Sequence, residues 1–166
     1  MARDEWARTG VRWEHRPTGR GRRSSRAGIA ERERALAGAP LFAGLSRRQL
    51  RDVARISGII GRPEGATLVQ EGAAGTVFYL ILDGAVKVVR KGRTVARLGP
   101  GNFFGELSLL DGGPRTASVI TEAPSQFLTL PRSSLRAALR SDGRLALRIL
   151  ETMAGRVRQL ERPLVG

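Results

Sequence analysis

The chain has 166 residues, with 29 basic and 15 acidic side chains, one histidine, no cysteine and a formal net charge of +14. This length suits one domain with an additional arm or helix. The missing cysteines exclude disulfides, thiol nucleophiles and thiolate metal sites. The only histidine, His15, excludes a multi-histidine metal site and disfavours a Ser-His-Asp triad. The charge favours an anionic partner: nucleic acid, an anionic membrane or a phosphate ligand.

The basic residues are almost all arginine, since Lys87 and Lys91 are the only lysines. The positive charge is spread along the chain and forms no separate basic domain. We therefore interpret it first as a solvated, arginine-biased surface, and we place a nucleic-acid surface second. No apolar run has the length of a membrane span, and the N-terminus lacks the apolar core of a secretory signal. These features predict a cytoplasmic protein with no membrane span.

Residues 1–27 are rich in Arg, Gly and Ser and predict a disordered basic tail. The alternative is a docked helix, because Trp6 and Trp13 are seven residues apart. Residues 28–57 predict N-terminal helices, one over 29–36 and a second over 46–57. Ser46 is a suitable N-cap for the second helix.

Residues 58–131 predict a β-domain, because short apolar and β-branched runs alternate with Gly-rich turns. Asp83-Gly84 is a strong hairpin signal, and Lys91-Gly92 predicts a second turn. This spacing favours an antiparallel sandwich or barrel. The predicted runs are Leu68-Val69, Val77 to Leu82, Val86 to Val89, Val95 to Leu98, Val119-Ile120 and Phe127 to Leu130.

Residues 132–166 predict C-terminal helices, a short one over 133–140 and a long one over about 142–162 that ends before Pro163. Apolar residues on the long helix repeat at intervals of four and three, as in a coiled coil. This pattern predicts a homodimer through residues 146–160, and the alternative is a helix that packs on its own barrel. The seam is Ala146, Leu150, Met153, Val157 and Leu160.

Residues 99–118 interrupt the strand pattern with a Gly-rich turn and a short helix that starts near Glu106. The free N–H groups of a first helical turn attract anions, and Arg115 adds a fork of donors. Gly105 would let the backbone approach a ligand closely. Because Glu106 would repel a phosphate, it needs another partner, for which a sugar hydroxyl is suitable. The segment therefore predicts a site for a phosphorylated sugar or nucleotide.

Two runs carry a resemblance to a known family: Phe104-Gly105-Glu106-Leu107-Ser108-Leu109-Leu110 and Pro114-Arg115-Thr116-Ala117-Ser118-Val119. Together they resemble the phosphate-binding cassette of cyclic nucleotide-binding domains, of the catabolite activator and protein kinase A regulatory subunit type. The resemblance covers about residues 36–162, with the cassette at 103–118. It implies a mainly β fold, an antiparallel β-roll or jelly roll of the double-stranded β-helix type, with flanking helices and a long C-terminal helix.

The resemblance also implies roles for the cassette residues. The N–H groups of Leu107 and Ser108 and the guanidinium of Arg115 would hold the cyclic phosphate. Glu106 would accept a hydrogen bond from the ribose 2′-OH, Gly105 would let the loop pack closely, and Thr116 and Ala117 complete the ligand contacts. Three alternatives stay open: a salt bridge from Arg115 to Glu122, a carboxylate at Glu106 that is only stabilised by the helix dipole, and an ordinary strand position at Thr116.

The identity of the nucleotide is less specified by the residues. A threonine after the cassette arginine, as at Thr116, occurs in family members that accept cyclic GMP, yet we favour cyclic AMP as ligand over cyclic GMP. Base contacts in this family come from the last helix, which implies Val157, Leu160 and Glu161 here. Leu160 and Glu161 differ from the small hydroxyl residues of catabolite activator relatives.

The predicted function is a cyclic nucleotide sensor that regulates an unidentified effector protein through its C-terminal helix, with no enzymatic activity and no cofactor. No helix-turn-helix segment follows the long helix before Gly166, so we expect a stand-alone sensor. The alternatives are a nucleic-acid-binding protein without sequence preference, a fragment of a transcriptional regulator, and a sensor that has lost its ligand. An enzyme on a cupin-like barrel is disfavoured, because its metal ligands are missing.

Overall fold

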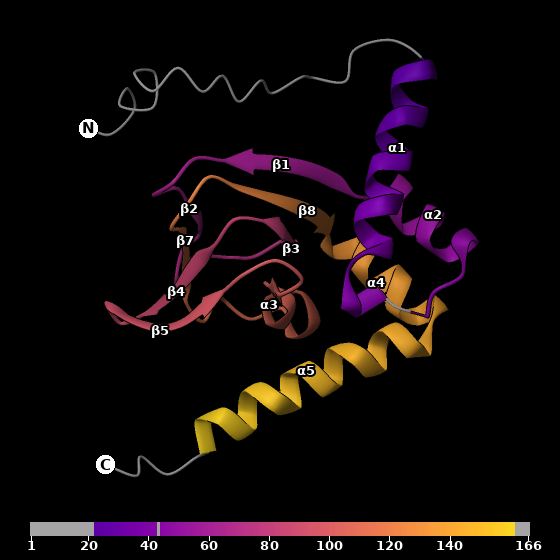
Figure 1. The fold of residues 1–166 in the computed structure, drawn as a ribbon. Helices are drawn as coiled ribbons and strands as arrows, with labels where there is room; N and C mark the ends of the chain where they lie inside the picture. Colours follow the sequence, from indigo (N-terminus) through magenta and orange to yellow (C-terminus); the bar gives the residue numbers. More distant parts are fainter. Residues whose placement is uncertain (1–21, 43, 162–166) are drawn as a thin grey trace.

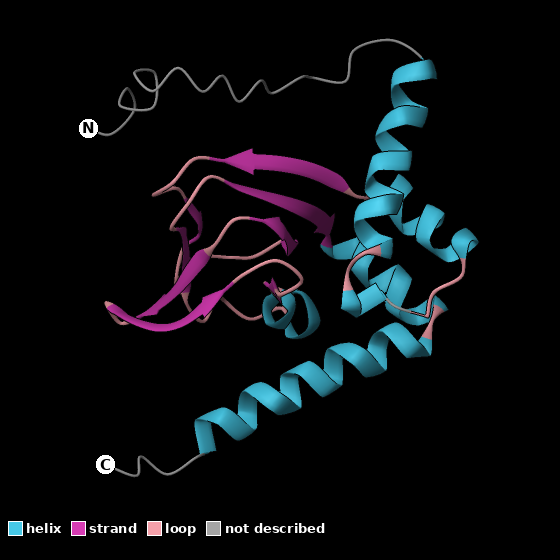
Figure 2. Ribbon diagram, in the orientation of Figure 1, coloured by secondary structure: helices cyan, strands magenta, loops and turns pink. Residues whose placement is uncertain are grey.

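The computed structural model describes residues 22–42 and 44–161, and Figure 1 shows their arrangement. Helices gather at one end of a β-roll, and the long helix α5 runs along one side of it (Figure 2). The helices are α1 (Arg22–Ala37), α2 (Arg47–Arg55), α3 (Glu106–Asp111), α4 (Arg132–Ser141) and α5 (Gly143–Glu161), with a 3₁₀ turn at Pro40–Phe42. The strands are β1 (Gly58–Arg62), β2 (Thr67–Val69), β3 (Val77–Asp83), β4 (Val86–Arg90), β5 (Arg93–Leu98), β6 (Phe103–Phe104), β7 (Ser118–Thr121) and β8 (Ser125–Pro131).

The strands form two four-stranded antiparallel sheets, with the orders β1-β8-β3-β6 and β2-β7-β4-β5. Most neighbours in each sheet are distant in sequence, as in the pairing of β1 with β8 and of β2 with β7, whereas β4 and β5 are consecutive. The predicted fold, a mainly β antiparallel roll with flanking helices and a long C-terminal helix, is therefore confirmed.

The sheet that contains β3 and β8 separates two apolar cores. Successive side chains of a strand point to opposite faces, so Leu80 and Phe103 pack toward the helices while their neighbours Ile81 and Phe104 pack toward the second sheet. This sheet is thus buried on both faces, which explains its nearly continuous apolar runs. On β8, Leu128 packs toward the helices and its neighbour Phe127 packs toward the second sheet, in the same alternation.

The two predicted turns have different outcomes. Lys91 and Gly92 have φ of 49° and 75°, and they join β4 to β5 through a two-residue hairpin that places Arg90 opposite Arg93. The hairpin predicted at Asp83-Gly84 is wrong, because β3 and β4 belong to different sheets and do not pair. Gly84 instead turns the chain from one sheet to the other with φ of 93°, and a Cβ there would lie 2.7 Å from the carbonyl oxygen of Pro124.

Other boundaries also differ from those predicted. Helix α1 begins at Arg22, inside the segment expected to be a disordered tail. The expectation rested on apolar burial, whereas Arg and Ala have high intrinsic helix propensity. Residues 1–21, including Trp6 and Trp13, lie outside the described residues. Strand β1 was not predicted, because two glycines reduce its apolar content.

No helix within the described ranges is long and apolar enough to cross a membrane.

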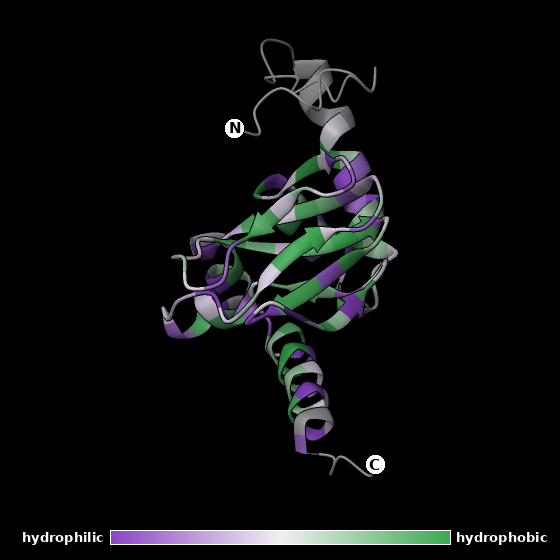
Figure 3. Cartoon of the chain, turned by 90° about the vertical axis from the view of Figure 1, so that its left-hand side faces the viewer, coloured by the Kyte–Doolittle hydropathy of each residue, from purple (hydrophilic) through white to green (hydrophobic). Residues whose placement is uncertain are grey.

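Helix α5 presents two different apolar faces. Leu145 and Ile149 are each 1% exposed and belong to the core under the helices, with Met153 packed against it. Leu147, Leu150 and Val157 are more than half exposed. The hydrophobic and hydrophilic turns of this helix are visible where it extends away from the roll in Figure 3. One half of the helix therefore anchors it, and an apolar stripe remains on its surface.

Candidate functional site

The cassette starts at Gly105, the residue before helix α3. Gly105 has φ of 90°, a left-handed conformation that favours glycine. A Cβ at this position would lie 2.7 Å from Nη1 of Arg115 and 2.8 Å from the carbonyl oxygen of Val77. Glycine is therefore required both for the backbone turn and for the close approach of Arg115.

Arg115 is 7% exposed, and backbone carbonyls hold its guanidinium. Nη1 donates to the carbonyl of Gly105 at 3.0 Å, and Nη2 donates to the carbonyl of Val77 at 2.7 Å. Gly75 faces the same side chain, because a Cβ there would lie 2.2 Å from Nε of Arg115. These contacts fix the direction of the guanidinium. Gly75 is a site residue that the sequence analysis did not identify, since the contact spans forty residues.

Burial lowers the pKa of Arg115 below its usual value, and the nearby Tyr79 and Glu106 partly oppose this shift. Within the part of the chain that the structure describes, Arg115 forms no ion pair with a carboxylate. The alternative partner Glu122 pairs with Arg97 instead, with 3.1 Å between Oε2 and Nε. Arg115 is therefore a buried cation whose charge is not neutralised by the described residues, and such a group favours an anion.

Glu106, the first residue of α3, is 2% exposed and forms an ion pair with Arg156 of α5. Nη1 of Arg156 donates to Oε1 of Glu106, and Nη2 donates to the carbonyl of Phe103. The guanidinium carbon also lies 5.1 Å from the ring centroid of Phe103, which is a cation–π arrangement. Arg156 thus ties α5 to the start of the cassette.

Arg156 was missed by the sequence analysis, which assigned a sugar hydroxyl as the partner of Glu106. The available signal was the need of a buried carboxylate for a cation. Arg156 is next to Val157, one of the residues considered as base contacts, but only the fold brings it to Glu106.

The other cassette residues lie around this centre. The backbone N–H groups of Leu107 and Ser108 have no acceptor among the described residues, and the Ser108 side chain is buried. Thr116 is exposed, and its carbonyl accepts a hydrogen bond from Nε of Arg90 at 3.3 Å. Ala117 is half-buried. The structure therefore brings two free N–H groups, a buried cation and a buried carboxylate to one short segment.

The residues considered as base contacts are less defined. Val157 is 52% exposed on α5, and Glu161 is exposed at the end of this helix. The side chain of Leu160 lies outside the described part of the chain. Among the described residues, no group of three or more His, Asp or Glu side chains could hold a metal ion.

Comparison with known proteins agrees with this geometry. Residues 62–142 match the family model of the cyclic nucleotide-binding domain. The chain belongs to this family. The matched residues include β3, the cassette and α4.

Two curated relatives belong to different branches of the family. The cyclic AMP receptor protein of Thermus thermophilus is 35% identical over 131 residues, which are 75% of this chain and 60% of the relative. A cAMP-dependent protein kinase regulatory subunit of Aspergillus fumigatus is 34% identical over 102 residues, which are 60% of this chain and 25% of that protein. The match therefore spans about three-fifths or less of the length of these relatives.

The fold matches solved structures of the family. The crystal structure of the Thermus thermophilus catabolite activator protein superposes with a TM-score of 0.67 and 33% identity. The match covers 74% of this chain and 60% of that one. This similarity extends the family assignment from the cassette to the roll and its flanking helices.

Proposed function

We propose that this chain is a cytoplasmic sensor that binds a cyclic nucleotide, cyclic AMP in preference to cyclic GMP, in the cassette from Gly105 to Ala117. The observation that carries the proposal is the buried Arg115, which is held by two carbonyls and lacks a carboxylate partner within the described residues. A cyclic phosphate carries one negative charge and would neutralise this cation. The free N–H groups of Leu107 and Ser108 would donate to the same phosphate.

Glu106 would hold the sugar. Its Oε1 accepts from Arg156, while Oε2 has no hydrogen-bond donor among the described residues. Oε2 can therefore accept a hydrogen bond from a ribose 2′-OH without loss of the ion pair. Arg156 also neutralises a carboxylate that would otherwise repel the phosphate. The two charges of the cassette thus suit a ligand with a phosphate and a hydroxyl close together.

We propose the preference for cyclic AMP because both curated relatives described above are named for cyclic AMP. Cyclic GMP is the competing ligand, because Thr116 occupies the position after the cassette arginine. Val157, Leu160 and Glu161 of α5 are the proposed contacts of the base. Because the base would lie on the helix that Arg156 ties to Glu106, binding would change the position of α5.

Helix α5 is also the proposed output of the sensor. Its exposed stripe of Leu147, Leu150 and Val157 has intervals of three and seven residues, which fit the repeat of a helix–helix seam. We assign this stripe to a homodimer within residues 146–160. A change in the position of α5 would then alter the dimer and its surface for an effector protein.

A thermal unfolding experiment tests the proposal. A ligand that binds only the folded state at about a hundredfold excess over its Kd stabilises it by about 2.7 kcal/mol. For a chain of this size, this raises Tm by about 5–10 °C. Cyclic AMP is expected to produce this shift, cyclic GMP a smaller one, and adenosine, which has no phosphate, none. An unchanged Tm with both cyclic nucleotides would refute the proposal.

A further inference from the structure

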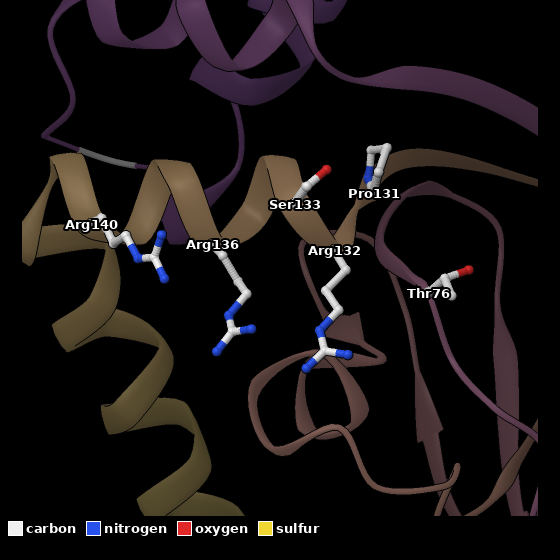
Figure 4. Close-up of a pocket in the computed structure, with 6 residues that line it drawn as sticks. All are labelled: Thr76, Pro131, Arg132, Ser133, Arg136 and Arg140. Carbon is white, nitrogen blue, oxygen red and sulfur yellow. The ribbon is translucent and has the colours of Figure 1, made fainter.

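Helix α4 carries an arginine on each of three successive turns, Arg132, Arg136 and Arg140, and we name this set the arginine row. Residues four apart lie on one face of a helix, about 6 Å apart along its axis. Figure 4 shows the three guanidinium groups extending to the same side of α4. The row therefore presents three positive charges over about 12 Å of helix.

The arginine row lines a groove of about 530 Å³ together with Thr76, Pro131 and Ser133. No acidic side chain is part of this lining. In the described ranges, none of the three guanidinium groups has a hydrogen bond or an ion pair, and Nε of Arg132 is buried without a partner. Cations on adjacent turns repel one another. The groove thus combines uncompensated positive charge with a buried donor that lacks an acceptor.

Two arginines near acidic side chains show what the row lacks, and the burial of Arg132 Nε distinguishes the row from the exposed arginines of the chain. Arg97 pairs with Glu122 and Arg156 pairs with Glu106, so acidic partners are used where they are within reach. A long arginine in solvent needs no partner, but the burial of Arg132 Nε removes it from water and makes a missing acceptor costly. The buried Nε of Arg132 and the lack of an acidic side chain in the lining indicate that the acceptors for the row come from another molecule.

The arginine row is separate from the cassette site. Arg132 lies against Gly112, at the C-terminal end of α3, whereas Arg115 lies against Gly105, at its N-terminal end. The chain at the start of β3 provides a backbone carbonyl to each of these two arginines. The carbonyl of Thr76 accepts from the backbone N–H of Arg132 at 2.9 Å, and the carbonyl of Val77 accepts from the side chain of Arg115. The row is therefore an additional anion-binding surface and shares no side chain with the proposed nucleotide site.

We propose that the arginine row binds an extended acidic segment of a partner protein, with carboxylates on alternate residues. Alternate residues of an extended chain point to the same side and repeat at about 6.6 Å, close to the spacing of the row. Guanidinium groups bind carboxylates in a bidentate geometry. The groove is open along α4 and does not enclose a small molecule. Its lining contains no aromatic side chain on which bases could stack, so an acidic peptide fits it better than nucleic acid.

Fluorescence anisotropy with the full chain tests the proposal. The probes are a labelled peptide with alternating Asp and Ser, the same peptide with Asn in place of Asp, and a single-stranded oligonucleotide. The test variant is Arg136→Gln with Arg140→Gln, and both side chains are exposed. The matched control is Arg47→Gln with Arg48→Gln on α2, which removes the same charge from exposed positions elsewhere.

We expect the acidic peptide to bind and the Asn peptide not to bind. The Arg136→Gln and Arg140→Gln substitutions should weaken binding by about 5- to 20-fold, and the α2 control by less than about twofold. Equal loss in both double variants, equal binding of the Asn peptide, or tighter binding of the oligonucleotide with the same loss in the test variant would each overturn the proposal. The Tm shift with cyclic AMP should be unchanged in the test variant, so failure of either proposal is seen separately.

Discussion

Arg115 and Glu106 are buried charges of opposite sign in one cassette, yet each is bound to other groups. Arg115 donates to the carbonyls of Gly105 and Val77, and Glu106 accepts from Arg156. If they neutralised each other directly, both would lose their capacity for a ligand. Their separate partners leave, among the residues that the structure describes, a cation without a carboxylate and a carboxylate oxygen without a donor.

Substitution of Gly75 tests whether the direction of Arg115 matters. In Gly75→Ala the new Cβ would overlap Nε, Cζ and Cδ of Arg115, so the guanidinium has to move. The loss of a charged hydrogen bond should weaken cyclic AMP binding by about 10- to 100-fold, measured by calorimetric titration. Gly99→Ala is the control, because nothing lies within 4 Å of its added Cβ. Wild-type affinity in Gly75→Ala would show that the site tolerates a displaced Arg115.

Arg156 should contribute to stability through the charge of Glu106. In Arg156→Gln the buried carboxylate loses its cation, while in Glu106→Gln no charge remains to be neutralised. We expect Arg156→Gln to lower the free energy of unfolding by about 1–3 kcal/mol, a value reduced because Arg156 is partly exposed. The same substitution should cost clearly less in the Glu106→Gln background, as measured by urea unfolding in a double-mutant cycle. Equal costs in both backgrounds would refute a role for the ion pair.

At the scale of elements, a turn motif in the sequence predicts where the backbone turns, but it does not predict which strands pair. Lys91-Gly92 and Asp83-Gly84 both mark turns with positive φ, but only the first joins paired strands. The second crosses between sheets, since β3 belongs to the sheet between the two cores and β4 belongs to the other sheet. Most strand runs and the position of the cassette segment were predictable from spacing and resemblance, but β1 was not. The pairing of Arg156 with Glu106 was not, since it depends on how α5 returns across the roll.

The exposed apolar stripe of helix α5 predicts that the chain forms a homodimer. Leu150 is 59% exposed and central in the stripe assigned to the homodimer. Leu150→Glu would place a charge in that seam, so it should convert a dimer to a monomer in light scattering after size-exclusion chromatography. Glu151→Gln is the control, because this neighbouring residue is also exposed but lies outside the apolar stripe. A wild-type chain that is monomeric, or a Leu150→Glu variant that stays dimeric, would contradict the seam.

At the scale of the whole molecule, one sheet and one helix connect the site to the rest of the fold. The β3–β8 sheet carries the helical core on one face and the inner core of the roll on the other. Helix α5 anchors in the helical core through Leu145 and Ile149 and reaches the cassette through Arg156. A ligand at Glu106 would therefore act, as proposed, on a helix that is fixed at one end and tied to the site near the other.

Calorimetric titration of the wild type and of Arg115→Gln with cyclic AMP tests the central claim most directly, with Arg93→Gln as an exposed control on β5. The account predicts that the wild type and Arg93→Gln bind with the same affinity. Arg115→Gln should bind about 10- to 100-fold more weakly, because the phosphate loses its charged donor. Tight binding to Arg115→Gln, or no binding of either cyclic nucleotide to the wild type, would contradict it.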